Sequence, residues 1–300
     1  MTMPWYFYAT AVPVLYSLSN YIDKFLVDNK VRDPLVITTI AGLATCFLGF
    51  AIGLIIGFPG LPAADCLLLL LAGILLVLNF IPYYQALKLE DASRVVPLYQ
   101  FIPVITLLLS VVILNESMTP KQITGMLIIV FAGLFLSAQN LSAKILTPRK
   151  SLWLMLLSSF MYGSVSILFR LTTKPAGFWT GLSYEYLGTG IGASLLLLIP
   201  SVRHHFRPQL KSLGSVIGLV SLTNFLSISA LISESYAVTL ISVPLVNLIS
   251  GTQPIFSIII GLILTVWFPR YIKEDISRQT LTEKLIAVSL IFFGLFLTFF

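Results

Sequence analysis

Long apolar runs separated by short polar segments make up almost the whole of this chain. A helix that crosses a bilayer needs about 20 mostly apolar residues. Such runs recur ten times, at approximately 5–22, 35–57, 65–87, 95–114, 122–139, 152–171, 177–199, 213–233, 240–267 and 283–300. The connections are short, except near 140–151, 200–212 and 268–282. The pattern predicts an all-α polytopic membrane protein with ten transmembrane helices and no extramembrane domain.

The composition supports a lipid environment. Hydrophobic residues make up 57% of the 300 residues and charged residues only 10%, with a mean hydropathy of +0.97. A soluble domain carries roughly a quarter charged residues. A soluble enzyme, a nucleic-acid-binding domain and a disordered chain are therefore excluded. The net charge of +6 comes from Lys and Arg dispersed over short loops, which is typical of membrane-flanking positions.

Cysteine and histidine give no sign of a metal or another cofactor. Cys46 and Cys66 fall in or beside apolar runs and form no Cys-x-x-Cys pair. His204 and His205 are adjacent in a basic segment that we expect to be a loop at the level of the lipid headgroups. Neighbouring residues on one chain seldom ligate the same ion, so we expect no cofactor and no metal.

The first five runs and the last five correspond, which indicates an internal repeat. Tyr16-Ser17 matches Tyr162-Gly163 with a shift of 146 residues, and Asn79-Phe80 matches Asn224-Phe225 with a shift of 145. Further matches in the same order pair Ala86 and Pro103 with Ala237 and Pro254, and Gly133-Leu-Phe-Leu with Gly294-Leu-Phe-Leu. A repeat with an odd number of spans must invert in the membrane. The sequence thus predicts two inverted five-helix repeats, 1–142 and 143–300.

These residues resemble a known family, the drug/metabolite transporter superfamily and specifically its EamA-type members. The similar features are Ala86-Leu87, Ala92-Ser93, Pro103-Val104, the Leu114-Asn115-Glu116 that ends the fourth run, and Gly125 and Gly133 in the fifth. The resemblance covers essentially the whole chain. It implies a secondary transporter or exporter that moves small metabolites, such as amino acids, nucleosides, sugars or drugs, by alternating access.

Polar side chains within the spans are candidates for the substrate site, because they are costly in lipid unless they face protein or water. They cluster on corresponding runs of the two halves, and two of these runs carry paired prolines, which mark interrupted helices. The alternative is that each of them only bonds a neighbouring helix. The substrate-binding candidates are Tyr16, Asn20, Asn79, Tyr83, Gln100, Tyr162, Ser166, Asn224, Asn247 and Gln253.

Glu185 is the one carboxylate that the sequence places well inside a span. It stands between two tyrosines in the seventh run, whereas the other acidic residues are assigned to loops or span ends. One hypothesis makes it a site for proton coupling or for a substrate amine. The other makes it a structural acid near the interface, paired with Arg170 or Lys174.

Two glycine series predict close helix packing. Gly49, Gly53 and Gly57 recur every four residues in the second run, and Gly188 and Gly192 do so in the seventh. Small residues at this spacing let helices approach closely in a membrane.

The basic residues are distributed unequally between the two sides. Of the 18 Lys and Arg, only Lys121, Arg170 and Lys174 fall on the side of the termini, which leaves fifteen on the other. The positive-inside rule would place the fifteen in the cytoplasm and both termini outside, whereas relatives usually have their termini inside.

The sequence therefore favours a multi-pass transporter in a bacterial or archaeal inner membrane, with a small-molecule substrate, the lipid bilayer and no nucleic acid as partners. The sequence does not decide whether the protein forms a homodimer. The alternatives are a receptor or assembly protein without transport and an intramembrane enzyme. The latter lacks any His-Glu-x-x-His, Gly-x-Ser-Gly or Gly-x-Gly-Asp motif. A site of Tyr, Asn, Ser and Gln suits small neutral or zwitterionic metabolites.

Overall fold

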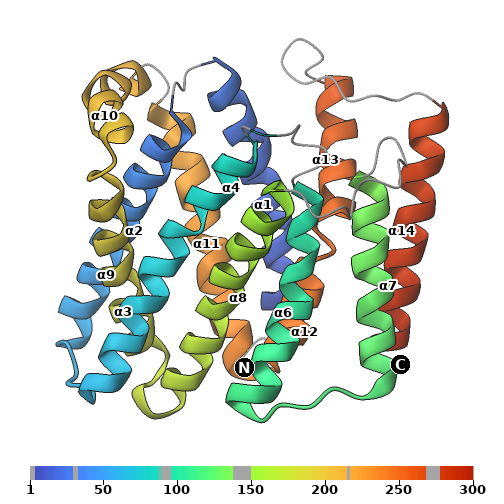
Figure 1. Ribbon diagram of the computed structural model, residues 1–300, viewed down its shortest axis with the longest axis horizontal. Coiled ribbons are helices and arrows are strands. Elements are labelled where there is room, and N and C mark those ends of the chain that lie inside the picture. The colour runs from blue at the N-terminus through green and yellow to red at the C-terminus, as the bar shows by residue number, and fades with distance from the viewer. Residues whose placement is uncertain are drawn as a thin grey trace.

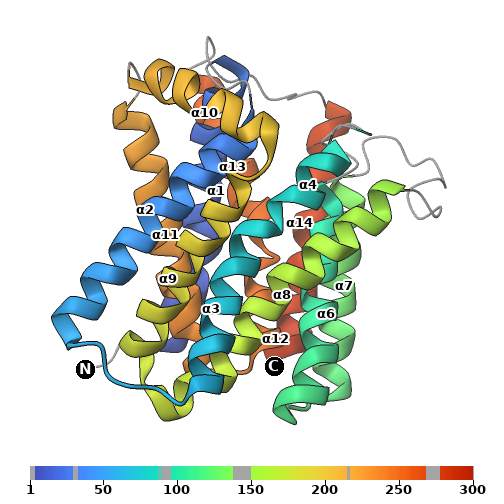
Figure 2. The ribbon, with the colours of Figure 1, turned by 60° about the vertical axis from the view of Figure 1, so that its left-hand side comes forward.

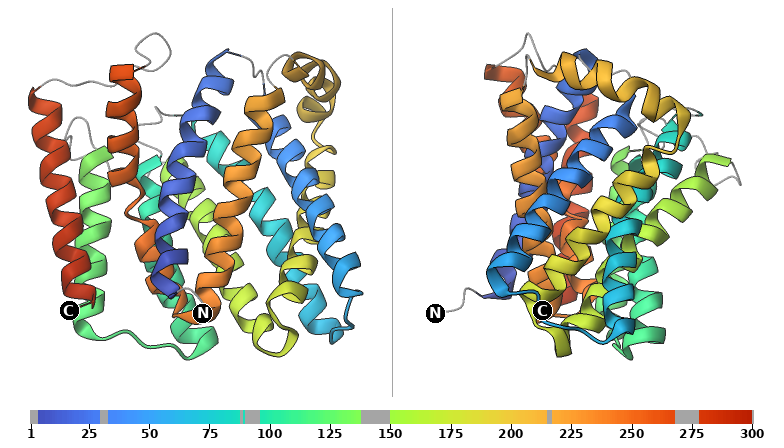
Figure 3. Two further views of the ribbon diagram at one scale, coloured as in Figure 1. Left: turned by 180° about the vertical axis from the view of Figure 1, so that it is seen from behind. Right: turned by 90° about the vertical axis from the view of Figure 1, so that its left-hand side faces the viewer.

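A computed structural model describes residues 4–29, 33–87, 89, 96–137, 150–214, 217–267 and 278–299. These residues are helical nearly throughout and contain no strand, so the predicted all-α membrane fold is confirmed. The helices run side by side as one bundle, and both ends of the chain lie at the same end of it (Figures 1 and 3). We call this the terminal face and the opposite one the basic face.

The described part of every predicted span lies on one helix or on two or three consecutive helical segments. The elements are α1 (Trp5–Asn29), α2 (Pro34–Ile56), α3 (Ala63–Leu78), α4 (Phe80–Leu87), η1 (Val96–Phe101), α6 (Ile102–Leu109), η2 (Ser110–Leu114), α7 (Pro120–Ser137), α8 (Lys150–Ala176), α9 (Phe178–Leu196), α10 (Pro200–Leu213), α11 (Ile217–Leu240), α12 (Val243–Ser250), α13 (Gln253–Trp267) and α14 (Arg278–Phe299). Residues 140–149 and 268–277, in two of the longer connections, lie outside the described residues.

By length and hydropathy alone, four helical stretches of the described chain can cross a membrane: Pro34–Ile56, Ala63–Ala86, Lys150–Lys174 and Val243–Leu264. A fifth follows if α9 is counted together with α10. Three shorter apolar stretches, Leu98–Leu114, Pro120–Ala132 and Leu285–Thr298, occupy further predicted spans. The chain is therefore an integral multi-pass membrane protein, and the count of ten transmembrane helices stays a prediction.

The helices predicted to be interrupted are interrupted. The fourth span begins as a 3₁₀ turn, continues as α6 and ends in the π-helical turn η2. The ninth span breaks between α12 and α13, at Gly251 and Thr252. Proline frees backbone groups from the helical ladder, and breaks of this kind gather at functional sites in membrane transporters. The two broken spans lie against each other, since α12 packs on α6.

Glycines bring α9 into close contact with α2 and α3. A Cβ atom on Gly49 would lie 2.9 Å from the backbone oxygen of Ser183, and one on Gly192 would lie 3.2 Å from that of Ile74. Gly188 approaches the backbone of α3 even more closely. The predicted role of these glycines in helix packing is confirmed.

The other two glycines of the second run do not pack helices. Gly57 ends α2 with a φ of 77° and has no atom near a Cβ position, so it serves as the C-cap. Gly53 is covered by the ring of Phe58, which follows the same helix. For these two positions the packing prediction is wrong, because the helix ends one residue before Gly57.

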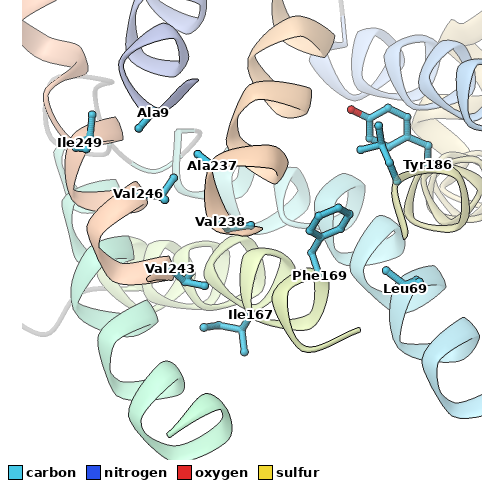
Figure 4. Close-up of a cluster of buried hydrophobic side chains, with 11 residues drawn as sticks. Ala9, Leu69, Ile167, Phe169, Tyr186, Ala237, Val238, Val243, Val246 and Ile249 are labelled. Carbon is cyan, nitrogen blue, oxygen red and sulfur yellow. The ribbon is translucent and has the colours of Figure 1, made fainter. Parts of the chain in front are cut away.

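A buried apolar cluster lies toward the terminal face of the bundle (Figure 4). It joins residues near the start of α1, the end of α8, the end of α11 and the start of α12, which all lie toward that face. α9 and α3 contribute as well, so both halves of the chain meet in it. The members shown are Ala9, Leu69, Ile167, Phe169, Tyr186, Ala237, Val238, Val243, Val246 and Ile249.

At the basic face the segment expected to be a loop is a helix. α10 contains both His204 and His205 and is bent by 105° from α9, so that it lies across the end of the bundle (Figure 2). The loop prediction is wrong because the charged residues of this segment alternate with apolar ones at helical spacing, which a hydropathy average does not detect.

Candidate functional site

Two tyrosines that the sequence aligned as counterparts meet within the bundle. The hydroxyl of Tyr16 on α1 lies 3.4 Å from that of Tyr162 on α8, and the two residues are 146 positions apart. Both lie near the middle of their helices. The sequence predicted both as site residues, and the structure brings them together across the two halves of the chain.

The tyrosine pair leads directly to a buried carboxylate, Glu234. The hydroxyl of Tyr162 donates a 2.9 Å hydrogen bond to Glu234 Oε2, and Ser166, one turn further along α8, bonds the same side chain. Glu234 is 5% exposed. Ser166 was predicted as a site residue, and it is the third member of this group.

Sequence reasoning missed Glu234, because it ended the eighth span at 233. α11 in fact continues to Leu240, so Glu234 lies well inside a helix. The polar stretch Ser233-Glu234-Ser235 lowers the hydropathy there. A signal was present nonetheless: Ala230, Ala237 and Val238 recur at helical spacing and are all buried, which shows that one apolar face continues past the glutamate.

The second buried carboxylate is Glu185, which the sequence did single out. It lies on α9, is 1% exposed, and its Oε2 atom has no hydrogen-bond partner. It is close enough to Glu234 for the two charges to interact, and Tyr16 is close to both. The backbone of α3 at Gly73 packs directly on the Glu185 carbonyl group, which fixes the position of this turn of α9.

The proposed pairing of Glu185 with Arg170 is wrong. Arg170 Nε lies 3.6 Å from Glu116 Oε1, at the end of the fourth span. Glu116 Oε2 also accepts a 3.2 Å hydrogen bond from the backbone N–H of Val243, which begins α12. Lys174 is exposed, and among the described residues neither Glu185 nor Glu234 forms an ion pair. The two central carboxylates therefore have no compensating cation within the described chain.

A second polar group surrounds the break between α3 and α4. The Asn79 side chain donates to the carbonyl oxygen of Leu76 on its own helix at 2.6 Å. Its backbone oxygen accepts from Ser158 on α8, which also bonds the hydroxyl of Tyr99. The ring of Tyr83 lies 5.2 Å from that of Tyr99. The predicted residues Asn79 and Tyr83 thus help to join α3 and α4 to neighbouring helices.

The remaining candidates lie near the break of the ninth span or on the surface. The Gln100 Oε1 atom is buried without a partner, next to Gly251 at the break. Asn247 bonds the carbonyl of Val243, and Ser17 donates to the carbonyl of Gln253. Asn224 is half-buried and Asn20 is exposed. No contact tests whether these side chains touch a substrate, so that role stays a prediction.

The described residues contain no group of three or more His, Cys, Asp or Glu side chains that could hold a metal ion. What the central group offers is two carboxylates bordered by hydroxyl groups. Such an arrangement can accept and release protons, or hold a cationic group, at the level of the membrane interior.

Comparison with known proteins agrees with this architecture. Residues 3–138 match the model of the EamA-like transporter family. An uncharacterised protein of Methanocaldococcus jannaschii is 26% identical over 132 residues, which are 43% of this chain and 93% of that protein. A solved crystal structure superposes with a TM-score of 0.66 at 17% identity and covers 98% of this chain and 95% of its own, which shows the same fold.

Proposed function

We propose that this protein is a proton-coupled secondary transporter that moves a small neutral or zwitterionic metabolite by alternating access, because residues 3–138 match the model of the EamA-like transporter family. Amino acids, nucleosides and sugars are the substrate classes that a site of tyrosine, amide and hydroxyl groups suits. The proton site is the group of Tyr16, Tyr162, Glu185 and Glu234.

The observation that carries the proposal is the pair of buried carboxylates that have no compensating cation among the described residues. An uncompensated charge in the membrane interior is costly, so such a group is retained where a proton or a charged ligand neutralises it during function. Glu234 accepts a hydrogen bond from Tyr162, and the Oε2 atom of Glu185 has none. Protonation should therefore be most favourable at the unbonded Oε2 atom of Glu185.

The packing toward the terminal face supports alternating access. Below the tyrosine pair the apolar cluster joins both halves of the chain, and the Glu116–Arg170 ion pair lies at its edge. A carrier that loads from the basic face needs this side shut in one state and open in the other. In the second state the contacts of Glu116 with Arg170 and Val243 must lengthen, because they join the fourth, sixth and ninth spans.

We place the protein in a bacterial or archaeal inner membrane with the basic face in the cytoplasm and both termini outside. Fifteen Lys and Arg are assigned to the basic face and three to the terminal face, which supports this orientation over the one that relatives usually have. A reporter fused to the C-terminus that is active only outside the cytoplasm tests it.

The test of transport uses proteoliposomes with a trapped pH-sensitive dye. Separate pools of neutral or zwitterionic amino acids, nucleosides and sugars are added from outside, and one pool should acidify the lumen and show saturable counterflow. Glu185→Gln and Glu234→Gln should abolish the proton signal, and Lys174→Gln, an exposed residue of α8, should leave it unchanged. Saturable flux with an unaltered proton signal in both variants would overturn proton coupling. Substrate binding without flux would indicate a receptor.

A further inference from the structure

The helix α10 presents two chemically distinct faces at the basic end of the bundle. It lies across the ends of the other helices, at 105° to α9 (Figure 2). Arg203, Arg207 and Lys211 recur every four residues and are all exposed, which puts three cations in one stripe. None of them forms an ion pair with a described residue.

The opposite face of α10 is fixed to the bundle through Asp33, the N-cap of α2. Ser201 donates a 2.8 Å hydrogen bond to Asp33 Oδ2, and His205 Nδ1 lies 3.7 Å from the same atom. Gln209 bonds both backbone groups of Asp33, at 3.0 and 3.1 Å. Since these residues recur every four positions, they determine the rotation of α10 and hold the basic stripe outward.

Apolar side chains at the edge of the stripe indicate where α10 lies relative to the membrane. Leu210 is 48% exposed beside Lys211, and Leu198, just before the helix, is 74% exposed. Phe206 is half-buried. A helix at 105° to the preceding span, with exposed leucines and a basic stripe, has the properties of an interfacial helix that contacts both acyl chains and headgroups.

We propose that the Arg203, Arg207 and Lys211 stripe of α10 binds the headgroup phosphates of anionic phospholipids in the leaflet at the basic face. The argument is charge complementarity: three exposed cations without an ion-pair partner among the described residues lie on a helix at the basic end of the bundle. Arg forms bidentate bonds with phosphate, and Lys contributes a point charge. The inference does not depend on the transport proposal, since it concerns a surface far from the tyrosine pair.

The experiment measures lipid binding to the purified full chain in neutral detergent. Phosphatidylglycerol and phosphatidylcholine are titrated separately, with native mass spectrometry to count bound lipids and thermal unfolding to detect stabilisation. The triple variant Arg203→Gln, Arg207→Gln, Lys211→Gln should lose phosphatidylglycerol affinity on the order of 100-fold, because each cation at an anionic surface contributes a factor of about five. The control, Lys121→Gln with Lys174→Gln, removes two exposed cations from the terminal face and should change little.

Three results would overturn the inference: unchanged phosphatidylglycerol binding in the triple variant, equal stabilisation by phosphatidylcholine, or equal stabilisation by soluble glycerol phosphate. A further variant, Ser201→Ala with Gln209→Leu, keeps every charge and weakens the attachment of α10. It should reduce phosphatidylglycerol affinity by about fivefold, as expected if one cation on average no longer faces the lipid. Unchanged affinity in this variant would show that the orientation set by Asp33 does not matter.

Discussion

The protein contains two kinds of buried or half-buried glutamate. Glu116 at the terminal face is paired with Arg170 and also accepts the backbone N–H of Val243, and its side chain is 18% exposed. Glu234 is more deeply buried and bonds hydroxyl groups, and the Oε2 atom of the buried Glu185 has no hydrogen-bond partner among the described residues. The first carboxylate is paired with a cation of the protein itself, whereas the other two have none among the described residues.

This difference assigns the two regions different tasks. A compensated pair between helices holds those helices together and is broken only when they separate. An uncompensated carboxylate beside a tyrosine contributes little to cohesion but changes its charge with each proton. We therefore expect substitutions at Glu116 to alter the balance between conformations and substitutions at Glu234 to alter coupling.

The largest effect is expected for Glu234→Gln. The amide keeps the size of the side chain and can still bond Tyr162, but it cannot exchange a proton. Proton-driven uptake into proteoliposomes should fall on the order of 100-fold, the lower end of what a positioned proton carrier contributes. For the native protein we expect uptake to decline as the pH on the loading side rises and fewer carboxylates are protonated, and this variant should lose that decline.

Glu116→Gln is the matched comparison, since it removes a charge of the same kind at the terminal face. Substrate counterflow without a proton gradient should survive in Glu234→Gln and be altered in Glu116→Gln. If both variants lose coupling and keep counterflow equally, the distinction between the two carboxylates is wrong.

A smaller effect is expected on stability from Arg170→Gln. The change leaves Glu116 half-buried without its cation, and we expect a loss of about 1–2 kcal/mol in the free energy of unfolding. Denaturant titration in detergent measures it, with the exposed Lys174→Gln as control. Adding Glu116→Gln to Arg170→Gln should restore part of the loss, since the unpaired charge is then removed. A double variant less stable than either single one would contradict this.

The smallest effect is expected for removing the hydroxyl group of either tyrosine, and it should differ between the two. Tyr162→Phe removes the 2.9 Å hydrogen bond to Glu234, whereas Tyr16→Phe removes only a 3.4 Å contact with Tyr162. One hydrogen bond to a charged or buried group is worth about 1–2 kcal/mol, so Tyr162→Phe should slow proton-driven uptake by roughly five- to thirtyfold. Tyr16→Phe should slow it less. Equal rates for both variants would show that the hydroxyl of Tyr162 does not act on Glu234.

The sequence predicted what depends on composition and on local spacing. Apolar runs located the helices, and paired prolines located the broken fourth and ninth spans. Tyr16 and Tyr162 were found as counterparts because they begin a series of matches that recur in the same order in both halves. Glu234 and α10 were missed for one reason: helical periodicity continued where average hydropathy fell. The partner of Arg170 could not be predicted, since three chain segments remote in sequence meet there.

The contacts of α9 carry a mechanical consequence. α2 and α3 both lie on α9 through backbone-to-backbone approaches at Gly49, Gly73 and Gly188, where even one methyl group has no room. Helices packed so closely cannot slide past one another, so we expect α2, α3 and α9 to move as one rigid body. Glu185 belongs to that rigid body, whereas Glu234 lies on α11, which packs much less extensively on α2 and α9. A rocking movement of α2, α3 and α9 relative to α11 would therefore change the distance between the two carboxylates. Because that distance affects the proton affinity of both, the movement and the proton affinity would be coupled.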